Sequence, residues 1–293
     1  MRDQAERLRE LARKTVDKVS ESETKVIAVA SGKGGVGKTN FVVNLALALQ
    51  EAGKRTIIFD ADMGMANIDI VLGVVPNYTL AHVVRGQKTL DEIVLDGPKG
   101  VKMLPGSSGA EDLVNLTDYQ VKNLINQWNE LEGDFDYLLV DTGAGIHTDV
   151  INFLTAAEDV VVVLTPEPPS ITDAYGLIKV LAQRDGDSKI HLIVNQVTNE
   201  KEGQRVFKRV SRVVDEFLHA HVNFLGFITY DDKVIAAVKR QKPFFLEYPN
   251  AKASKEITSI MEKLIDKPSD KSSNNGGMKK FLNKVIGFFN SSS

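Results

Sequence analysis

The chain has 293 residues, with 36 Lys and Arg, 39 Asp and Glu, a net charge of −3 and no cysteine. The small net charge excludes a uniformly basic nucleic-acid binder but leaves room for a local basic patch. The absence of cysteine excludes disulfides, thiolate metal sites, cysteine-ligated iron–sulfur clusters and a catalytic thiol. No stretch reaches the roughly 18 apolar residues of a membrane span, and the start lacks a secretory signal, so a cytoplasmic protein is expected.

Composition divides the chain into four expected segments. Residues 1–24 are polar, with a weak apolar stripe at helical spacing, and predict a short helix on a tether. Residues 25–265 read as the globular body. Residues 266–277 are rich in Ser, Asn, Gly and Pro and predict a flexible linker. Residues 278–293 form a small apolar and basic tail.

Within the body, short apolar runs alternate with amphipathic stretches. Continuous β-branched runs are typical of strands buried on both faces of a parallel sheet. The pattern predicts a doubly wound α/β domain with a mostly parallel sheet flanked by helices. Strands are expected at 26–30, 56–59, 137–140, 160–164 and 191–194, with weaker candidates at 101–104 and 224–228, and helices at 38–52, 117–130, 171–183, 203–219 and 252–265.

The first expected strand is followed by a phosphate-binding loop. Residues 31–39 read SGKGGVGKT, which matches G-x-x-x-x-G-K-[ST] between a strand and a helix. The candidate nucleotide-binding residues are Gly34, Gly35, Val36, Gly37, Lys38, Thr39 and Asn40. The glycines let backbone N–H groups face phosphates, Lys38 neutralises phosphate charge, and the Thr39 hydroxyl suits Mg²⁺.

Acidic residues end two further expected strands. Asp60 and Asp62 follow the run at 56–59, and Asp141 follows the run at 137–140, ahead of a Gly-rich turn. Ligands of open α/β sheets bind at these carboxyl ends, so Asp141 is a candidate Mg²⁺ ligand with Thr39. Asn195 ends another strand and is a candidate partner of the adenine edge, although a turn-capping role is an alternative.

The loop pattern K-G-G-x-G-K-T, with its additional Lys33, resembles the deviant Walker A ATPases that include MinD and ParA. That resemblance covers about residues 25–265. It implies a P-loop fold, slow Mg²⁺-dependent hydrolysis of ATP to ADP, and an ATP-bound homodimer in which Lys33 reaches the partner's nucleotide. Lys38 would stabilise phosphate charge, and Asp62 would orient the attacking water.

The two ends of the chain indicate which group within this ATPase family the sequence resembles. In 278–290, Phe281, Leu282, Val285, Phe288 and Phe289 gather on one helical face opposite lysines, which suits an anionic membrane surface. A tail helix docked on the protein's own core is the alternative. The segment D-Q-A-E-x-L-R at 3–9 resembles the FlhG family, also called YlxH or FleN, which regulates flagellar number and placement. That resemblance implies stimulation of the GTPase FlhF by residues 1–20, with Gln4 as the residue suited to orienting water.

These features together predict a cytoplasmic ATPase that associates reversibly with the inner face of the cytoplasmic membrane. Flagellar basal-body components are further candidate partners, and DNA is not an expected one. Two alternatives stay open. A DNA-partitioning ATPase like ParA would use the basic stripe of Arg205, Lys208, Arg209 and Arg212, and a MinD-type division-site ATPase would share the membrane chemistry.

Overall fold

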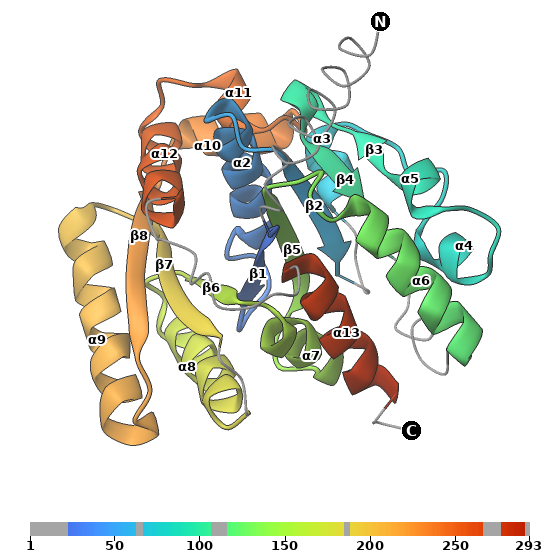
Figure 1. The fold of residues 1–293 in the computed structure, drawn as a ribbon. Helices are drawn as coiled ribbons and strands as arrows, with labels where there is room; N and C mark the ends of the chain where they lie inside the picture. The colour runs from blue at the N-terminus through green and yellow to red at the C-terminus, as the bar shows by residue number, and fades with distance from the viewer. Residues whose placement is uncertain (1–22, 63–66, 107–115, 185–187, 266–276, 291–293) are drawn as a thin grey trace, which may run out of the picture.

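The computed structural model describes residues 23–62, 67–106, 116–184, 188–265 and 277–290. In these ranges the strands form one sheet in the order β3-β4-β2-β5-β1-β6-β7-β8 (Figure 1). Every neighbouring pair is parallel except β3 with β4. The strands are β1 Lys25–Ser31, β2 Thr56–Ala61, β3 Leu95–Asp96, β4 Lys102–Leu104, β5 Tyr137–Ala144, β6 Asp159–Leu164, β7 Lys189–Val197 and β8 Val222–Thr229.

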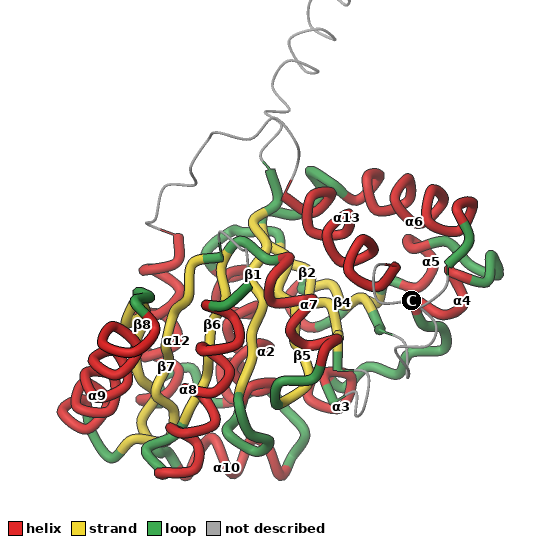
Figure 2. The backbone as a smooth tube through the Cα atoms, turned by 90° about the horizontal axis from the view of Figure 1, so that it is seen from below, coloured by secondary structure: helices red, strands yellow, loops and turns green. Residues whose placement is uncertain are grey.

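Helices cover both faces of the sheet (Figures 1 and 2). One face carries α2 Lys38–Glu51, α10 Asp232–Lys239, α11 Phe244–Glu247 and α12 Lys252–Ile265. The other face carries α6 Asp118–Leu131, α7 Thr148–Ala156, α8 Pro168–Ala182, α9 Glu200–Leu218 and α13 Gly277–Asn290. Short helices α3 Ile68–Leu72, α4 Leu80–Val84 and α5 Leu90–Ile93, with a 3₁₀ turn at Pro98–Gly100, connect β2 to β4.

The alternation of strand side chains explains the two layers. In β1, Val26 and Ala28 pack into one hydrophobic cluster while Ile27 and Val29 pack into the other, and all four are fully buried. Successive strand residues point to opposite faces, so a strand covered on both sides needs a continuous apolar run. The expected doubly wound, mostly parallel α/β fold is confirmed.

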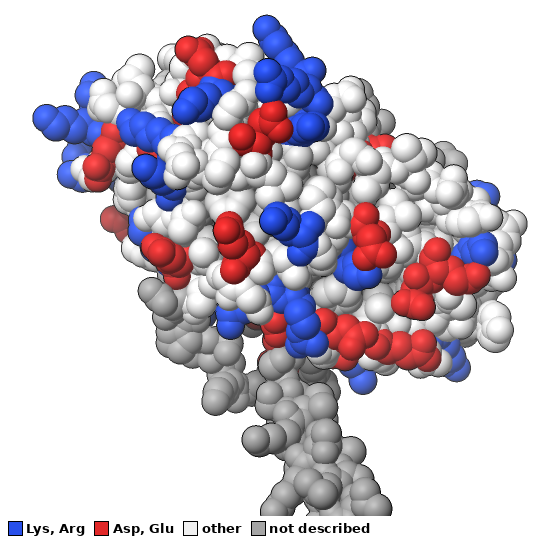
Figure 3. Space-filling view, turned by 90° about the horizontal axis from the view of Figure 1, so that it is seen from above, with Lys and Arg blue, Asp and Glu red and all other residues white. Residues whose placement is uncertain are grey.

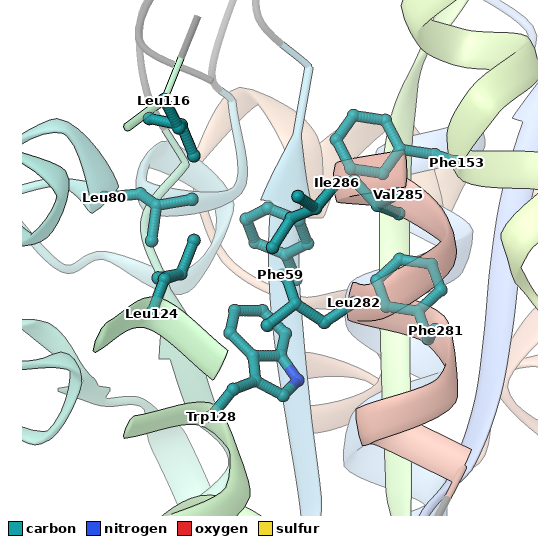
Figure 4. Close-up of a pocket in the computed structure, with 10 residues that line it drawn as sticks. All are labelled: Phe59, Leu80, Leu116, Leu124, Trp128, Phe153, Phe281, Leu282, Val285 and Ile286. Carbon is teal, nitrogen blue, oxygen red and sulfur yellow. The ribbon is translucent and has the colours of Figure 1, made fainter. Parts of the chain in front are cut away.

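Helix α13 lies against the sheet rather than away from it. Its apolar face packs into a groove lined by Phe59, Leu80, Leu116, Leu124, Trp128 and Phe153, as Figure 4 shows. Phe281 is 1% exposed and stacks on Phe153 with ring centroids 6.3 Å apart. Leu282 and Val285 are also buried.

This docking differs from the expected exposed tail. The amphipathic pattern predicted a helix correctly, but the groove that receives it is built from β2, α4, α6 and α7. Those elements are far from the tail in sequence, so no local pattern reports that they form a matching apolar surface. Among the described helices, none has the length and apolar content needed to cross a membrane.

Candidate nucleotide site

The loop between β1 and α2 has the backbone conformation of an anion cradle. Gly35 and Gly37 have φ of +80° and +92°, a backbone region that residues with a Cβ rarely adopt. A Cβ on Gly37 would also lie 2.5 Å from Nδ2 of Asn195. Lys38 then begins α2, so the helix dipole and its free N–H groups face the loop.

Lys38 and Asp141 meet at the centre of the site. Nζ of Lys38 lies 2.6 Å from Oδ1 of Asp141, and both side chains are buried. The Thr39 hydroxyl lies beside Asp141. Burial raises the pKa of Asp141, while the Lys38 charge and hydrogen bond and the neighbouring Thr39 hydroxyl act in the opposite direction. The structure therefore brings together the lysine, the hydroxyl and the carboxylate that the sequence assigned to phosphate and Mg²⁺.

A second carboxylate lies beside this pair. Asp60 stands opposite Asp141 in the register of β2 and β5, and its Oδ2 is buried without a hydrogen-bond partner. Burial and the nearby Asp141 charge raise the pKa of Asp60 to about 7. Two carboxylates buried this close are stabilised by a cation, so the donor set fits Mg²⁺.

Asp62 directly follows β2 and lies near the end of β5. The chain at Asp62 and the turn at residues 145–147 after β5 are here called the two switch segments. The Asp62 backbone N–H donates to Oδ1 of Asp60, at 3.2 Å. A Cβ on Gly143, near the end of β5, would lie 3.6 Å from Oδ1 of Asp62. The side chain expected to orient water thus sits at the carboxyl ends of β2 and β5.

Lys33 projects from the loop and pairs with a residue that sequence analysis missed. Its Nζ lies 3.2 Å from Oε2 of Glu167, with the two side chains 43% and 63% exposed. Glu167 is the N-cap of α8. No motif surrounds Glu167. The one sequence signal is that it follows a buried strand and so lies at the same edge of the sheet as the phosphate loop.

A cavity of about 430 Å³ adjoins the phosphate loop. Asn40, Asn195 and Thr229 are among its lining residues, together with apolar side chains from α10 and α11. The size and mixed lining suit a nucleobase. Nδ2 of Asn195 donates to the Val36 carbonyl oxygen at 2.8 Å, and its Oδ1 accepts from the Gln196 N–H. Asn195 therefore braces the loop in this structure.

A buried carboxamide that sequence analysis did not find fixes the helix behind the loop. Asn44 is fully buried on α2, where its Nδ2 donates to the Asn40 carbonyl and its Oδ1 accepts from the Phe245 N–H. Polar residues inside an otherwise apolar helix face are the signal that could have identified it.

Three sequence candidates lie elsewhere. Gln4 is outside the described residues, as is the side chain of Phe289, and Phe288 is partly buried against the hydrophobic cluster on the α13 face of the sheet. The basic stripe on α9 is exposed at all four positions. On the face seen in Figure 3, Lys and Arg are interspersed with Asp and Glu.

The fold and this site define a P-loop nucleotide-binding protein. A family model described as the CobQ/CobB/MinD/ParA nucleotide binding domain matches residues 27–244. The antiactivator FleN of Pseudomonas aeruginosa is 41% identical over 239 residues, covering 82% of this chain and 85% of FleN. The flagellum site-determining protein YlxH of Helicobacter pylori is 35% identical over 252 residues, covering 85% of this chain and 84% of YlxH.

A solved structure agrees with these relatives. The septum site-determining protein MinD of Pyrococcus horikoshii, complexed with Mg-ADP, aligns with a TM-score of 0.68 at 26% identity, covering 86% of this chain and all of that one. The chain belongs to the MinD/ParA family of P-loop ATPases, in the group that contains FleN and YlxH. It is an ATPase, and ATP or ADP with Mg²⁺ are its cofactors.

Proposed function

We propose that this ATPase regulates flagellar number and placement as an ATP-dependent, membrane-associating dimer. The observation that carries the proposal is the similarity to FleN and YlxH over more than four fifths of the chain. The direct test is expression in Helicobacter pylori lacking YlxH. Restored flagellar placement by the wild-type chain, and not by a Lys33→Ala variant, is expected. Unchanged flagellation with the wild-type chain produced at normal levels contradicts the proposal.

The site residues divide the chemistry among them. Lys38 stabilises phosphate charge, and Thr39 and Asp141 hold Mg²⁺, which offsets negative charge on the phosphates. Asp62 orients the attacking water. Support comes from the contact of Lys38 and Thr39 with Asp141 and from the position of Asp62 next to Gly143. Binding the nucleotide requires Lys38 to exchange Asp141 for phosphate.

Lys33 serves the partner's nucleotide in the dimer. Its pairing with Glu167 is exposed, and such ion pairs contribute at most about 1 kcal/mol. Lys33 can therefore leave Glu167 with little loss of free energy when a second copy brings the phosphates of its bound nucleotide close.

Membrane association requires α13 to leave its groove. Residues Phe281, Leu282 and Val285 cannot face lipid while they are packed against Phe153 and Trp128. Burial of each such side chain is worth about 1.5–3 kcal/mol, so the groove competes with the bilayer for the same surface. Two tail helices on one dimer then bind a membrane more tightly than one.

Two residues that line the α13 groove are close in sequence to the two switch segments. Phe59 lines the groove and directly precedes Asp60 in β2. Phe153 belongs to α7, which begins at Thr148 just after the turn at residues 145–147. A rearrangement of these switches around ATP would therefore move two walls of the groove, which supports a link between the nucleotide and α13.

Vesicle flotation with anionic lipid tests the membrane role. The wild-type chain should float with a non-hydrolysable ATP analogue and remain in solution with ADP. Deletion of residues 277–293 should abolish flotation, and the polar-face variant Asn283→Ala should float like wild type. Equal flotation of the deletion variant would reject α13 as the anchor.

The N-terminal segment is proposed to stimulate the GTPase FlhF. A peptide of residues 1–20 should accelerate GTP hydrolysis by FlhF, with Gln4 orienting water, so Gln4→Ala should weaken the effect. Turnover is measured at saturating peptide, with Glu10→Ala as the control. Binding without acceleration would leave the segment as a docking arm only.

A division-site role is the second candidate, since MinD of Bacillus subtilis is 31% identical over 246 residues. Both functions use a membrane-bound dimer, and only the flagellar one needs residues 1–20. Loss of FlhF stimulation with retained ATP-dependent flotation would favour the MinD-type role. Salt-dependent DNA binding through the α9 stripe, with no flotation, would favour the ParA type.

A further inference from the structure

Thr24, just before β1, and Lys279, in the first turn of α13, both donate a backbone hydrogen bond to the same carboxylate, that of Glu132. Oε1 of Glu132 accepts the backbone N–H of Thr24 at 3.1 Å, and Oε2 accepts the backbone N–H of Lys279 at 3.0 Å. Glu132 is the C-cap of α6 and is half-buried. In Figure 2 the beginning of β1 lies next to the beginning of α13.

Each of these two N–H groups depends on the carboxylate. Lys279 is in the first turn of α13, where backbone N–H groups have no partner within the helix. Thr24 directly precedes β1, and its side chain is separately tied to the Phe135 carbonyl at 2.7 Å. Because one carboxylate accepts from both donors, its position sets the geometry of both hydrogen bonds.

Direct packing reinforces this link. A Cβ on Gly277 would lie 2.3 Å from the Thr24 carbonyl oxygen and 2.6 Å from Oε1 of Glu158. The first turn of α13 thus lies against the backbone of Thr24 with no room for a side chain. Thr24 and Gly277 are therefore in direct backbone contact.

Lys25 extends the contact to the preceding helix. Its Nζ donates to the Leu264 carbonyl oxygen in the last turn of α12, at 3.4 Å, and pairs with Asp159 at 3.2 Å. Residues 24 and 25 therefore touch both the end of α12 and the start of α13. These are the described positions that flank residues 266–276.

We propose that Glu132 couples the docking of α13 to the conformation of the chain at Thr24. A partner that reorders the segment before Thr24 loosens α13, and a surface that extracts α13 loosens Thr24, because coupling between two sites is reciprocal. The identity of the two agents, a GTPase and a membrane, rests on the proposed function. The coupling is a property of the isolated chain.

Hydrogen exchange of the full chain, without lipid or partner, tests the coupling. In Glu132→Gln one acceptor oxygen becomes a donor, so one of the two amides loses its partner. Exchange at Thr24 and Lys279 should both rise about tenfold, as expected for loss of a bond to a charged acceptor. The control Glu130→Gln removes an exposed charge from the same helix and should change neither amide.

The reciprocal experiment deletes residues 277–293. Exchange at Thr24 should rise in the otherwise wild-type chain, and Glu132→Gln should add much less in the deleted chain than in the full one. A rise at only one amide in Glu132→Gln, or an unchanged Thr24 amide after deletion, overturns the proposal. Since no vesicle is present, a failure of membrane binding leaves this outcome unaffected.

Discussion

Lys33 and Lys38 leave the same loop but have different surroundings. Lys38 is buried against Asp141, whereas Lys33 is exposed and pairs with Glu167. The loss of Lys38 therefore affects the charge balance inside the site, and the loss of Lys33 leaves that interior intact.

Lys33→Ala should bind ATP within about threefold of wild type and fail to dimerise with a non-hydrolysable ATP analogue, because the proposed role of this ammonium is at the partner's nucleotide. Size-exclusion chromatography with light scattering measures this, and the exposed Lys99→Ala serves as the control. A Lys33→Ala protein that dimerises as wild type does would remove the cross-interface role.

Asp62→Ala should bind ATP and dimerise, but release phosphate at least tenfold more slowly, since orientation of water contributes to the transition state rather than to binding. Nucleotide affinity and phosphate release are measured on the same preparation, with Asp91→Ala as an exposed control. Turnover equal to wild type would reassign the water-orienting role.

At the scale of elements, a buried charge cluster joins three strands at the edge opposite the nucleotide site. Asp159 begins β6, pairs with Lys25 of β1 at 3.2 Å, and lies 2.5 Å from Nε2 of His191 of β7. Burial alone would raise the pKa of Asp159, but the His191 hydrogen bond and the Lys25 charge outweigh it and hold the pKa below its ordinary value.

Asp159→Asn should lower the free energy of unfolding by about 3 kcal/mol at pH 7, because it leaves buried charge without its partner. A pKa depressed by folding contributes stability above the unfolded pKa of about 4, and that contribution is lost as the pH falls below it. Urea unfolding at pH 7 and pH 3.5 should show the difference between wild type and variant shrinking at the lower pH. A difference that is constant with pH would contradict this origin.

The strands and long helices of the body were predictable because each carries its own periodicity. Helix α7 was missed: its apolar residues Val150, Ile151, Phe153 and Leu154 have helical spacing, but the helix is short and follows a Gly-rich turn. The phosphate loop, Thr39 and Asp141 were found because their chemistry requires a fixed local order.

What sequence could not supply were contacts between distant segments. Glu167 and Glu132 have no motif around them, and each gains its role only when the sheet brings Lys33 or Lys279 close. The docking of α13 depends in the same way on Leu80, Trp128 and Phe153, which come from three separate helices.

At the scale of the whole molecule, the nucleotide site and the α13 groove lie on a common framework. Strand β2 carries Phe59 into the groove and Asp60 to the nucleotide end, where Asp62 directly follows the strand. Under the proposed function, ATP shifts α13 from this groove to a membrane surface. The single tryptophan of the chain, Trp128, lies under α13 with 1% exposure, so its emission reports the docked state.

The most direct measurement is therefore Trp128 fluorescence with anionic vesicles, comparing a non-hydrolysable ATP analogue with ADP. We expect a red shift of the emission maximum with the ATP analogue, as water reaches the vacated groove, and an unchanged maximum with ADP. Binding to vesicles with the ATP analogue while the emission of Trp128 stays unchanged would contradict this expectation, because α13 would then still occupy its groove.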